Sequence, residues 1–374
     1  FAIVKNKISA YKLTPLSMLE PEITGLISNI KKKEGLADRL WKLYQELLKP
    51  VLEELNEDKS INTITIIPDG ILGYLPFELL LQNKPKKQDN LKSYAYLLKD
   101  YTTSYHQSLS LVEYNKRKEK RAALTRFVGF APEFKKEGNP LLATRSAKDK
   151  EIAKGLEMLP GALQEVQQIA KIMQGEVKIG NDATESSFKA LAKNAEILHL
   201  ATHTIIDDEN PLYSKLVFTT ENNVEEDGLL YNYELFNMDF NAQLVSLSAC
   251  NTGIGKYLKG EGIMSLANGF MYAGVPNVMM TAWAVPDIST VNVMQAFYMA
   301  LKDGQSESEA LRDAKLNYLK NADENLSHPY YWGAYMMIGN AKTSNTNRLF
   351  YWLAAFLLIA IITFSIIKKK KRIA

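Results

Sequence analysis

The chain has 374 residues, enough for one large or two modest globular domains. Hydrophobic residues make up 46% of it and charged residues 23%, which is typical of a globular protein and excludes collagen-like, disordered and low-complexity chains. A single cysteine excludes an internal disulfide, and four scattered histidines make a poor set of zinc ligands. We therefore expect neither a metal nor another cofactor.

The net charge of +3 comes from the C-terminus. Six of the 45 Lys and Arg residues follow residue 347 with no acid among them, so the preceding body carries the other 39 against 42 acidic residues. A slightly acidic body lacks the positive surface that nucleic-acid binding requires, and we expect no nucleic-acid partner. The first residue, Phe1, is not Met, which indicates a piece of a longer protein, and we interpret residues 1–21 as the end of an upstream region.

Strand-like and helix-like segments alternate along most of the chain, which predicts a parallel or mixed α/β sheet covered on both faces. Leucines at helical spacing predict helix within residues 22–56, and a β-branched run predicts a strand at 63–67. Ser306, with Glu309 three residues later, has the spacing of a capping box. Further strands are predicted at 127–131, 197–201, 216–219, 244–247 and 278–281, and further helices at 165–173, 263–273, 289–302 and 306–319.

Residues 349–367 form a run of nineteen residues without a charged side chain. At ~1.5 Å rise per residue, a helix of this length spans about 28 Å, which matches the core of a bilayer. The sequence KKKKR follows directly, so the positive-inside rule predicts that the tail, 368–374, is cytoplasmic. We expect the body to lie on the extracytoplasmic, periplasmic side, joined by a linker at 342–348. The alternative is a tail-anchored protein with a cytosolic body.

Two predicted strands end in residues that can carry out chemistry. Cys250 follows the strand 244–247 on a turn of small residues, and His203 follows the strand 197–201. If these strands are parallel neighbours, both side chains emerge at the edge of the sheet where α/β proteins bind ligands. A thiolate is the reactive form of cysteine, and a facing imidazole can take up the thiol proton.

Each of these residues has an alternative interpretation. A lone cysteine such as Cys250 can be an inert, buried side chain, because cysteine packs well as a small hydrophobe. His199 competes with His203 as the base, but residues four apart on a strand lie ~13 Å apart, so only one can reach Cys250. His199 lies inside the apolar run, and we predict that it packs in the core.

Six segments of the chain together carry a family resemblance. They are IIPDGILGYLPFELL (66–80), LPGALQEVQQIAKIM (159–173), ILHLATH (197–203), LVSLSACNTGIG (244–255), GEGIMSLANGFMYAGVPNVMMTAWAVPD (260–287) and HPYYWGAYMMIGN (328–340). In this order they resemble the CHAT domain family, which is similar to caspases and separases and is often fused to tetratricopeptide repeats. The resemblance covers about residues 20–340 and implies a caspase-like three-layer α/β fold with a mixed, mostly parallel sheet. It also implies that residues 22–160 form a pseudo-caspase half and residues 161–341 the half that carries the dyad.

The resemblance implies a dyad in which His203 is the general base and Cys250 the nucleophile. It further implies that the backbone N–H groups of Thr204 and Cys250 stabilise the oxyanion. The family usually has glycine after the histidine, where this chain has Thr204. Threonine keeps the N–H donor but would be strained if the position required a positive φ.

Two functions follow from these observations. The first is a membrane-anchored cysteine endopeptidase that cleaves a protein or peptide substrate. The second is an inactive CHAT scaffold for protein–protein interaction, which Thr204 favours. Expected partners are the substrate, upstream tetratricopeptide repeats, an activating partner and the membrane.

A substrate-binding role is predicted for Trp283 and Asp287, which follow the strand 278–281. A carboxylate walled by an indole suits a cationic side chain, and the resemblance to separases also favours arginine before the cleaved bond. The alternative is that Asp287 belongs to the start of the following helix, where an acidic residue is ordinary capping chemistry.

Overall fold

The computed structural model describes residues 1–4, 7–56, 60–86, 90–118, 125–134, 156, 159–207, 209–220, 226–248, 256–258, 262–264 and 266–339. The chain divides into two compact units, Phe1–Lys342 and Thr343–Ala374. The predicted linker at 342–348, membrane segment at 349–367 and basic tail at 368–374 lie outside the residues that are described. Within the described ranges, none of the helices combines the length and apolar composition needed to cross a membrane.

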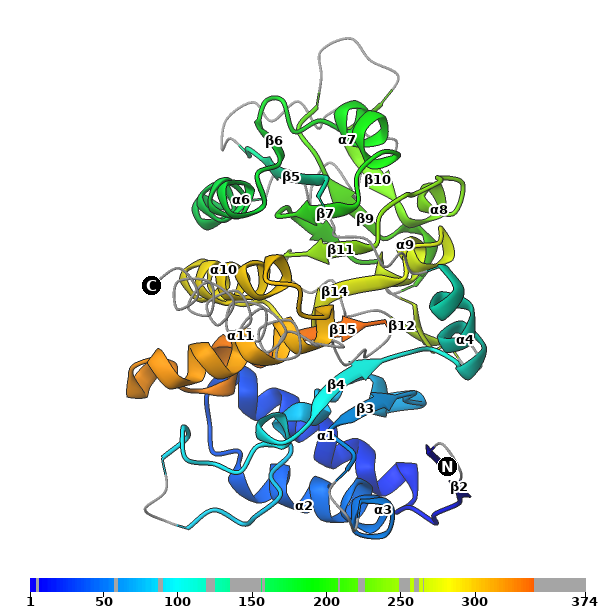
Figure 1. The fold of residues 1–374 in the computed structure, drawn as a ribbon, viewed down its shortest axis with the longest axis vertical. Helices are drawn as coiled ribbons and strands as arrows, with labels where there is room; N and C mark the ends of the chain where they lie inside the picture. The colour runs from blue at the N-terminus through cyan, green and yellow to red at the C-terminus, as the bar shows by residue number, and fades with distance from the viewer. Residues whose placement is uncertain are drawn as a thin grey trace, which may run out of the picture. The chain divides into compact units, whose positions relative to one another are not determined.

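An eight-stranded sheet runs through the centre of the first unit (Figure 1). Strands β3, β4 and β15 run parallel to one another, and β14, β11, β7, β5 and β6 run parallel in the opposite sense. The reversal occurs where β15 pairs antiparallel with β14. The expected mixed, mostly parallel sheet is therefore confirmed. In spatial order the strands are β3 (Thr63–Ile66), β4 (Thr102–Tyr105), β15 (Tyr335–Ile338), β14 (Asn277–Thr281), β11 (Leu244–Leu247), β7 (Ile197–Leu200), β5 (Phe127–Pro132) and β6 (Glu176–Gly180).

Helices cover both faces of this sheet (Figure 1). Successive residues of β5 show the two faces, because side chains alternate along a strand. Phe130 packs edge-on against Phe188 of α7, whereas the neighbouring Gly129 faces α6, where an added Cβ would lie 2.7 Å from Cγ1 of Val166. The helices on the α6 side are α6 (Pro160–Met173), α10 (Asp287–Lys302) and α11 (Glu307–Asn321), and those on the other side are α7 (Glu185–Ala192), α8 (Asn232–Leu235) and α9 (Leu266–Tyr272).

Beyond the β3 edge, the N-terminal residues form a helical cap (Figure 1). The region predicted as helix at 22–56 is three helices, because Lys33 adopts a left-handed conformation with φ of 58° and ends the first. Smaller elements complete the unit. The helices are α1 (Leu16–Lys32), α2 (Ala37–Leu47), α3 (Lys49–Leu55) and α4 (Leu109–Lys118), and the small sheets contain β1 (Ala2–Val4) with β2 (Lys7–Ser9), β8 (Thr204–Ile205) with β9 (Lys215–Val217) and β10 (Leu229–Tyr231), and β12 (Lys256–Leu258) with β13 (Gly262–Met264).

A buried ion pair ties segments from the two ends of the unit together. The Lys315 ammonium, on α11, lies 2.6 Å from Oε1 of Glu78 and donates to the Tyr335 carbonyl oxygen at 2.5 Å. The Tyr105 hydroxyl, on β4, donates to the other oxygen of Glu78. Lys315 and Glu78 are both fully buried, so this network joins α11, β15 and β4.

Several elements differ from the sequence-based expectation. Strands β4, β6 and β15 were not predicted, and α6 begins five residues before the predicted start because Pro160 occupies its first turn. The capping box at Ser306 and Glu309 is confirmed. Although β5 precedes residue 160, it lies between β7 and β6, among the strands of the predicted second half.

Candidate active site at the carboxyl ends of two parallel strands

The predicted strands that precede His203 and Cys250 are parallel neighbours. Ile197 of β7 pairs with Leu244 of β11, and Leu200 pairs with Leu247. The Ser248 N–H donates to the Leu200 carbonyl oxygen at 3.0 Å, which extends the ladder by one residue. Both strands therefore deliver the chain to the same edge of the sheet.

The order of the parallel strands marks this edge as a ligand-binding position. The chain passes from β5 outward to β6, returns to β7 on the other side of β5, and then continues outward through β11 and β14. In open parallel sheets, ligands bind outside the carboxyl ends of the strands where such a reversal occurs. Here the reversal lies between β5 and β7.

His203 follows β7 by three residues, at the carboxyl end of a strand that flanks this reversal. Its imidazole packs against the ring of Phe134, which follows β5, with 4.8 Å between ring centroids. The His203 carbonyl oxygen accepts from the Val217 N–H at 3.0 Å, and the Thr202 hydroxyl donates to the Val217 carbonyl oxygen. Pairing with β9 therefore fixes the backbone around His203.

Thr204 begins β8, where it pairs with Leu216. In the described part of the chain the only residues other than glycine with positive φ are Lys33 and Gln174, so Thr204 does not occupy the strained region. The threonine at this position therefore costs no backbone strain. The predicted oxyanion role of the Thr204 N–H stays a prediction.

The remaining predicted site residues are Cys250, Trp283 and Asp287, and their positions differ in kind. Cys250 lies outside the described residues, and its role stays a prediction. Trp283 is buried, and its indole N–H donates to the Tyr330 carbonyl oxygen at 2.9 Å. As placed, Trp283 is a buried side chain that holds the loop after β14, and its substrate-binding role stays a prediction. Asp287 is the first residue of α10, which agrees with the helix-start alternative, and its pairing with a cationic substrate stays a prediction.

His199 occupies a fully buried polar position in the core. Its Nε2 lies 2.8 Å from Oε1 of Glu165 on α6, and its Nδ1 lies 3.1 Å from the Tyr298 hydroxyl on α10. The Tyr298 hydroxyl in turn donates to the Ser246 hydroxyl oxygen on β11 at 2.8 Å. The prediction that His199 packs in the core is confirmed, and its polar partners were not predicted.

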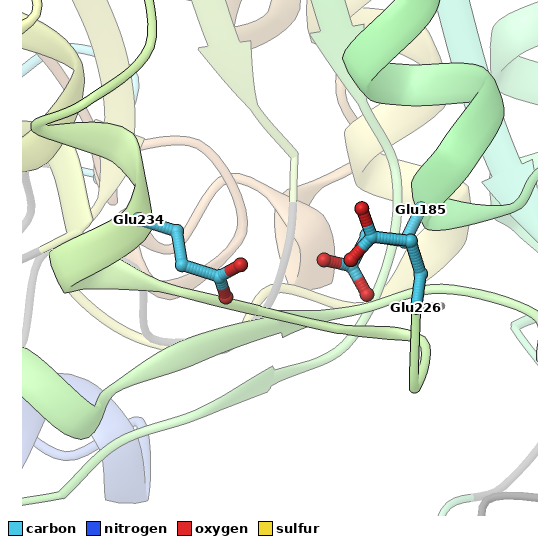
Figure 2. A group of neighbouring side chains, drawn as sticks. All are labelled: Glu185, Glu226 and Glu234. Carbon is cyan, nitrogen blue, oxygen red and sulfur yellow. The ribbon is translucent and has the colours of Figure 1, made fainter. Parts of the chain in front are cut away.

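Sequence reasoning also missed a cluster of three carboxylates beside the small sheet that contains Thr204. Glu185 begins α7, Glu226 precedes β10 and Glu234 lies on α8, and Figure 2 shows these side chains converging. One oxygen of each lies within 4.8 Å of the others, a separation that could suit a metal ion. The i,i+4 spacing of Glu185 and Lys189 was visible in the sequence, but nothing in the sequence links them to the other two carboxylates.

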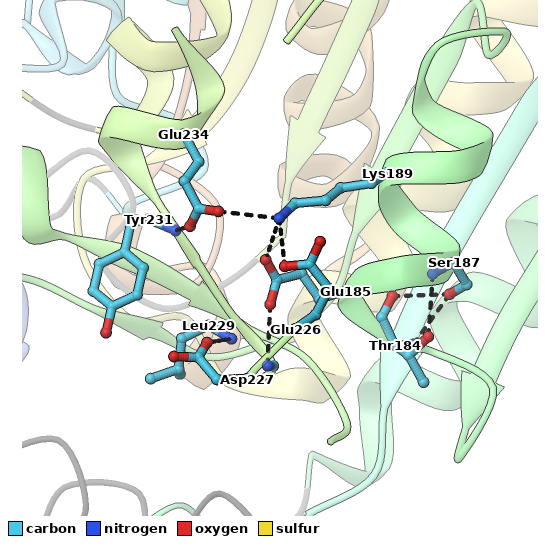
Figure 3. Close-up of polar contacts among 10 residues, drawn as sticks. Thr184, Glu185, Ser187, Lys189, Glu226, Asp227, Leu229, Tyr231 and Glu234 are labelled. Atoms are coloured by element: carbon cyan, nitrogen blue, oxygen red, sulfur yellow. Dashed lines mark hydrogen bonds and ion pairs between the residues drawn. The ribbon is translucent and has the colours of Figure 1, made fainter. Parts of the chain in front are cut away.

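The ammonium of Lys189 is the cation that these carboxylates contact (Figure 3). Its Nζ lies 2.7 Å from Glu185, 2.7 Å from Glu226 and 3.0 Å from Glu234. Glu185 also accepts from the Gly228 N–H at 3.0 Å. The cluster therefore connects α7 and α8 to the chain entering β10.

Burial shifts the protonation of this cluster. Burial, reinforced by Glu226 and Glu234 and opposed by Lys189, raises the pKa of Glu185 to about 7. Burial alone would lower the pKa of Lys189, but its hydrogen bonds to the three carboxylates outweigh burial and raise it. Glu185 is thus the member that titrates near neutral pH.

We predict a pH-dependent effect of Glu185→Gln on the free energy of unfolding. The folded-state pKa lies above the ordinary value of 4.5, so the stabilisation due to protonated Glu185 is complete below pH ~4.5 and is lost as the pH rises through about 7. Glutamine does not ionise, so the variant should gain stability relative to the parent between pH 5 and pH 8. Urea unfolding followed by circular dichroism measures the difference.

The control is Glu54→Gln. Hydrogen bonds from Lys7, Tyr11 and Ser9 lower the pKa of Glu54 to about 2, so it does not titrate in this range. Its stability difference from the parent should stay constant between pH 5 and pH 8. A constant difference for Glu185→Gln as well would contradict the proposed titration.

Part of the chain is similar in sequence to two curated proteins. Tetratricopeptide repeat protein 28 of Homo sapiens is 25% identical over 219 residues, and the Mus musculus protein is 24% identical over the same length. These matches cover 50% of this chain and 9% of each relative. The chain therefore matches only a small part of these relatives.

Two solved structures overlap most of the chain at low sequence identity. The complex of the pro- and mature domains of Porphyromonas gingivalis RgpB gives a TM-score of 0.47 at 7% identity, covering 88% of this chain and 77% of that one. The Saccharomyces cerevisiae separase–securin complex gives a TM-score of 0.44 at 13% identity, covering 79% and 18%. The family model for the CHAT domain matches residues 38–340, and the chain belongs to the CHAT domain family.

Proposed function

We propose that this CHAT domain is a cysteine endopeptidase with His203 as the general base and Cys250 as the nucleophile. One observation carries the proposal. Every pair in the β7–β11 ladder joins residues 47 positions apart, and 47 positions also separate His203 from Cys250. Because both strands end at the same edge of the sheet, we infer that the segments after them bring the His203 imidazole and the Cys250 thiol within reach of each other.

The proposed chemistry needs only these two side chains, backbone donors and water. His203 takes the thiol proton of Cys250, and the thiolate attacks the peptide carbonyl carbon to form a tetrahedral oxyanion. Backbone N–H groups of Thr204 and Cys250 stabilise that oxyanion. The imidazolium then protonates the leaving amine as the C–N bond breaks, and His203 next activates a water that hydrolyses the thioester and releases Cys250.

The environment of His203 supports a role as base. Its backbone is fixed by pairing with β9, and its ring is held against Phe134, which follows β5. An inactive scaffold was favoured by Thr204, but Thr204 lies in β8 without a positive φ. This observation weakens the argument for the scaffold.

The substrate and the wider assembly are part of the same proposal. We infer a protein or peptide substrate, since the dyad acts on an acyl carbon held by backbone contacts. Tetratricopeptide repeats upstream, as the name of the relatives suggests, would gather the substrate or an activating partner. Residues 349–367 would anchor the domain in a membrane, with the cationic tail in the cytoplasm.

The juxtaposition of the dyad can be tested without an assay of activity. Since Cys250 is the sole cysteine, His203→Cys creates a chain with two thiols. We expect diamide to join them in an intramolecular disulfide, because the proposed dyad requires residues 203 and 250 to lie as close together as a disulfide demands. Thiol titration and non-reducing peptide mapping measure the product. Lys31→Cys, on α1 beyond the β3 edge, is the control that should keep both thiols. Two free thiols in the oxidised His203→Cys chain would contradict the proposed arrangement.

Activity is tested with an irreversible thiol-directed peptidyl probe and a peptide library. Cys250→Ala should abolish labelling, and His203→Gln should lower cleavage by about 10³-fold or more, because residues that act as one unit lose their effect together. His199→Gln should chiefly lower the folded fraction, since it leaves Glu165 and Tyr298 without a partner. An active His203→Gln protein would contradict the assignment of the base, and a parent that is never labelled would favour the scaffold.

Topology is tested by adding protease to intact spheroplasts that express the full chain. We expect digestion of residues 1–340 and protection of the Lys368–Arg372 tail, because moving five cations across a membrane is unfavourable. Permeabilised cells provide the control for access to the tail. Protection of the body in intact spheroplasts would support the tail-anchored alternative.

A further inference from the structure

A continuous chain of buried polar groups connects the two strands that precede the proposed dyad. It consists of Glu165, His199, Tyr298 and Ser246, and each of these residues is at most 2% exposed. The successive heavy-atom distances are 2.8, 3.1 and 2.8 Å. The chain begins on α6, crosses β7, passes through α10 and ends on β11. We name this set of four residues the buried relay.

Two of the three hydrogen bonds of the buried relay run from His199 toward Ser246. The Tyr298 hydroxyl donates its only proton to Ser246, so its oxygen accepts from the Nδ1–H of His199. Burial raises the pKa of Tyr298, so the hydroxyl stays protonated. Nε2 of His199 then shares a single proton with the Glu165 carboxyl group. The buried polar groups of the relay therefore all have hydrogen-bond partners only when all four residues are in place.

The two strand residues of the relay are direct partners across the β7–β11 ladder, where His199 pairs with Ser246. All the remaining residues of the two strands are apolar, since the sequences are ILHL and LVSL. A slip of two residues would keep the same side chains on each face and exchange one aliphatic contact for another. The relay favours the observed register over such a slip, because after it His199 and Ser246 would lose their shared partner, Tyr298.

Close packing of α6 brings the fourth member into reach. At Gly129 of β5, which pairs with His199, an added Cβ would lie 2.7 Å from Cγ1 of Val166. The missing side chain lets α6 lie against the sheet at this point. Glu165, which precedes Val166, thereby reaches His199.

The position of the relay links it to the proposed dyad. His199 lies four residues before His203, and Ser246 lies four residues before Cys250. A shift in the pairing of β7 with β11 would therefore displace His203 from Cys250 by the same amount. Resting on the proposed function, we propose that the buried relay fixes the β7–β11 register and that its members are positioning residues for the His203–Cys250 dyad.

The chain contains a matched control for this proposal. Tyr318 on α11 and Ser289 on α10 form a second buried tyrosine–serine hydrogen bond, with 3.2 Å between their oxygens. This bond joins two helices and involves neither β7 nor β11. Tyr298→Phe and Tyr318→Phe therefore delete the same chemical group from the same kind of contact, and only Tyr298→Phe breaks the relay.

The first measurement does not depend on catalysis. In the full chain carrying His203→Cys, the rate of diamide cross-linking to Cys250 is compared with and without each tyrosine substitution. We expect Tyr298→Phe to slow cross-linking at least 5-fold and Tyr318→Phe to leave it within 2-fold of the parent rate. Ser246→Ala breaks the relay from its other end without altering the tyrosine ring and should slow cross-linking in the same direction.

The second measurement concerns the rate of peptide cleavage with His203 restored. We expect Tyr298→Phe to lower kcat at least 10-fold with KM within 2-fold, and Tyr318→Phe to leave both unchanged after correction for the folded fraction. A purely structural role would lower the folded fraction of both variants and leave kcat per folded molecule intact.

The outcomes separate this inference from the proposed function. If the His203→Cys parent cross-links but Tyr298→Phe and Ser246→Ala do so at the parent rate, the relay does not set the register and the inference is overturned while the dyad stands. If cross-linking depends on the relay but the parent cleaves no peptide, the positioning of residues 203 and 250 is supported and the peptidase assignment fails. If the parent does not cross-link, both are overturned.

Discussion

The hydrogen-bond ladder between β7 and β11 is the constraint on which the candidate site depends. A parallel ladder carries the ends of both strands to one edge of the sheet, and its register alone decides which residues meet there. The reversal of strand order lies between β5 and β7 at this edge, and pairing of β8 with β9 holds the segment after His203. If β7 and β11 were separated or out of register, the segments that follow them would not meet at this edge, and the pairing of β8 with β9 would not bring them together.

Buried polar groups recur where this fold joins segments that are distant in sequence. Glu165 and His199 link a helix to the central strands, Glu78 and Lys315 link the two ends of the unit, and Lys189 gathers carboxylates from three segments. Buried ion pairs often add little stability relative to well-packed apolar residues, because desolvation costs several kcal/mol per ion. Their contribution here is better understood as selection of one arrangement, since a charged group left without its partner in the core is strongly unfavourable.

The sequence predicted features that depend on local patterns. Apolar runs located β7, β11 and β14, and the spacing of Ser306 and Glu309 located the start of α11. That β7, β11 and β14 lie side by side could not be predicted in this way, because the periodicity of a sequence does not give the order of strands in a sheet. The local sequence pattern also indicated that His199 lies within a strand and that His203 follows the end of that strand, and the structure places both residues accordingly.

The features that could not be predicted depend on long-range contacts. Strand β4 has the polar sequence TTSY, yet all four residues are buried because β3 and β15 flank it. The indole of Trp283 donates to the carbonyl oxygen of Tyr330, 47 residues later, a contact that no local pattern indicates. The contacts of Lys189 with Glu226 and Glu234 likewise arise only once the small sheet has formed.

The reversal of direction at β15 determines where the chain leaves the sheet. Ile338, at the carboxyl end of β15, pairs with Val278 of β14. Val278 lies beside Val245 of β11, and Val245 lies beside Leu198 of β7. Val278, Val245 and Leu198 are all near the amino ends of their strands. The chain therefore departs at Gly339 from the edge opposite His203, next to Tyr105 at the end of β4. Had β15 been parallel to β14, its exit would have fallen on the same edge as His203. The antiparallel insertion therefore puts the exit of the chain from the sheet and the carboxyl ends of β7 and β11 on opposite edges.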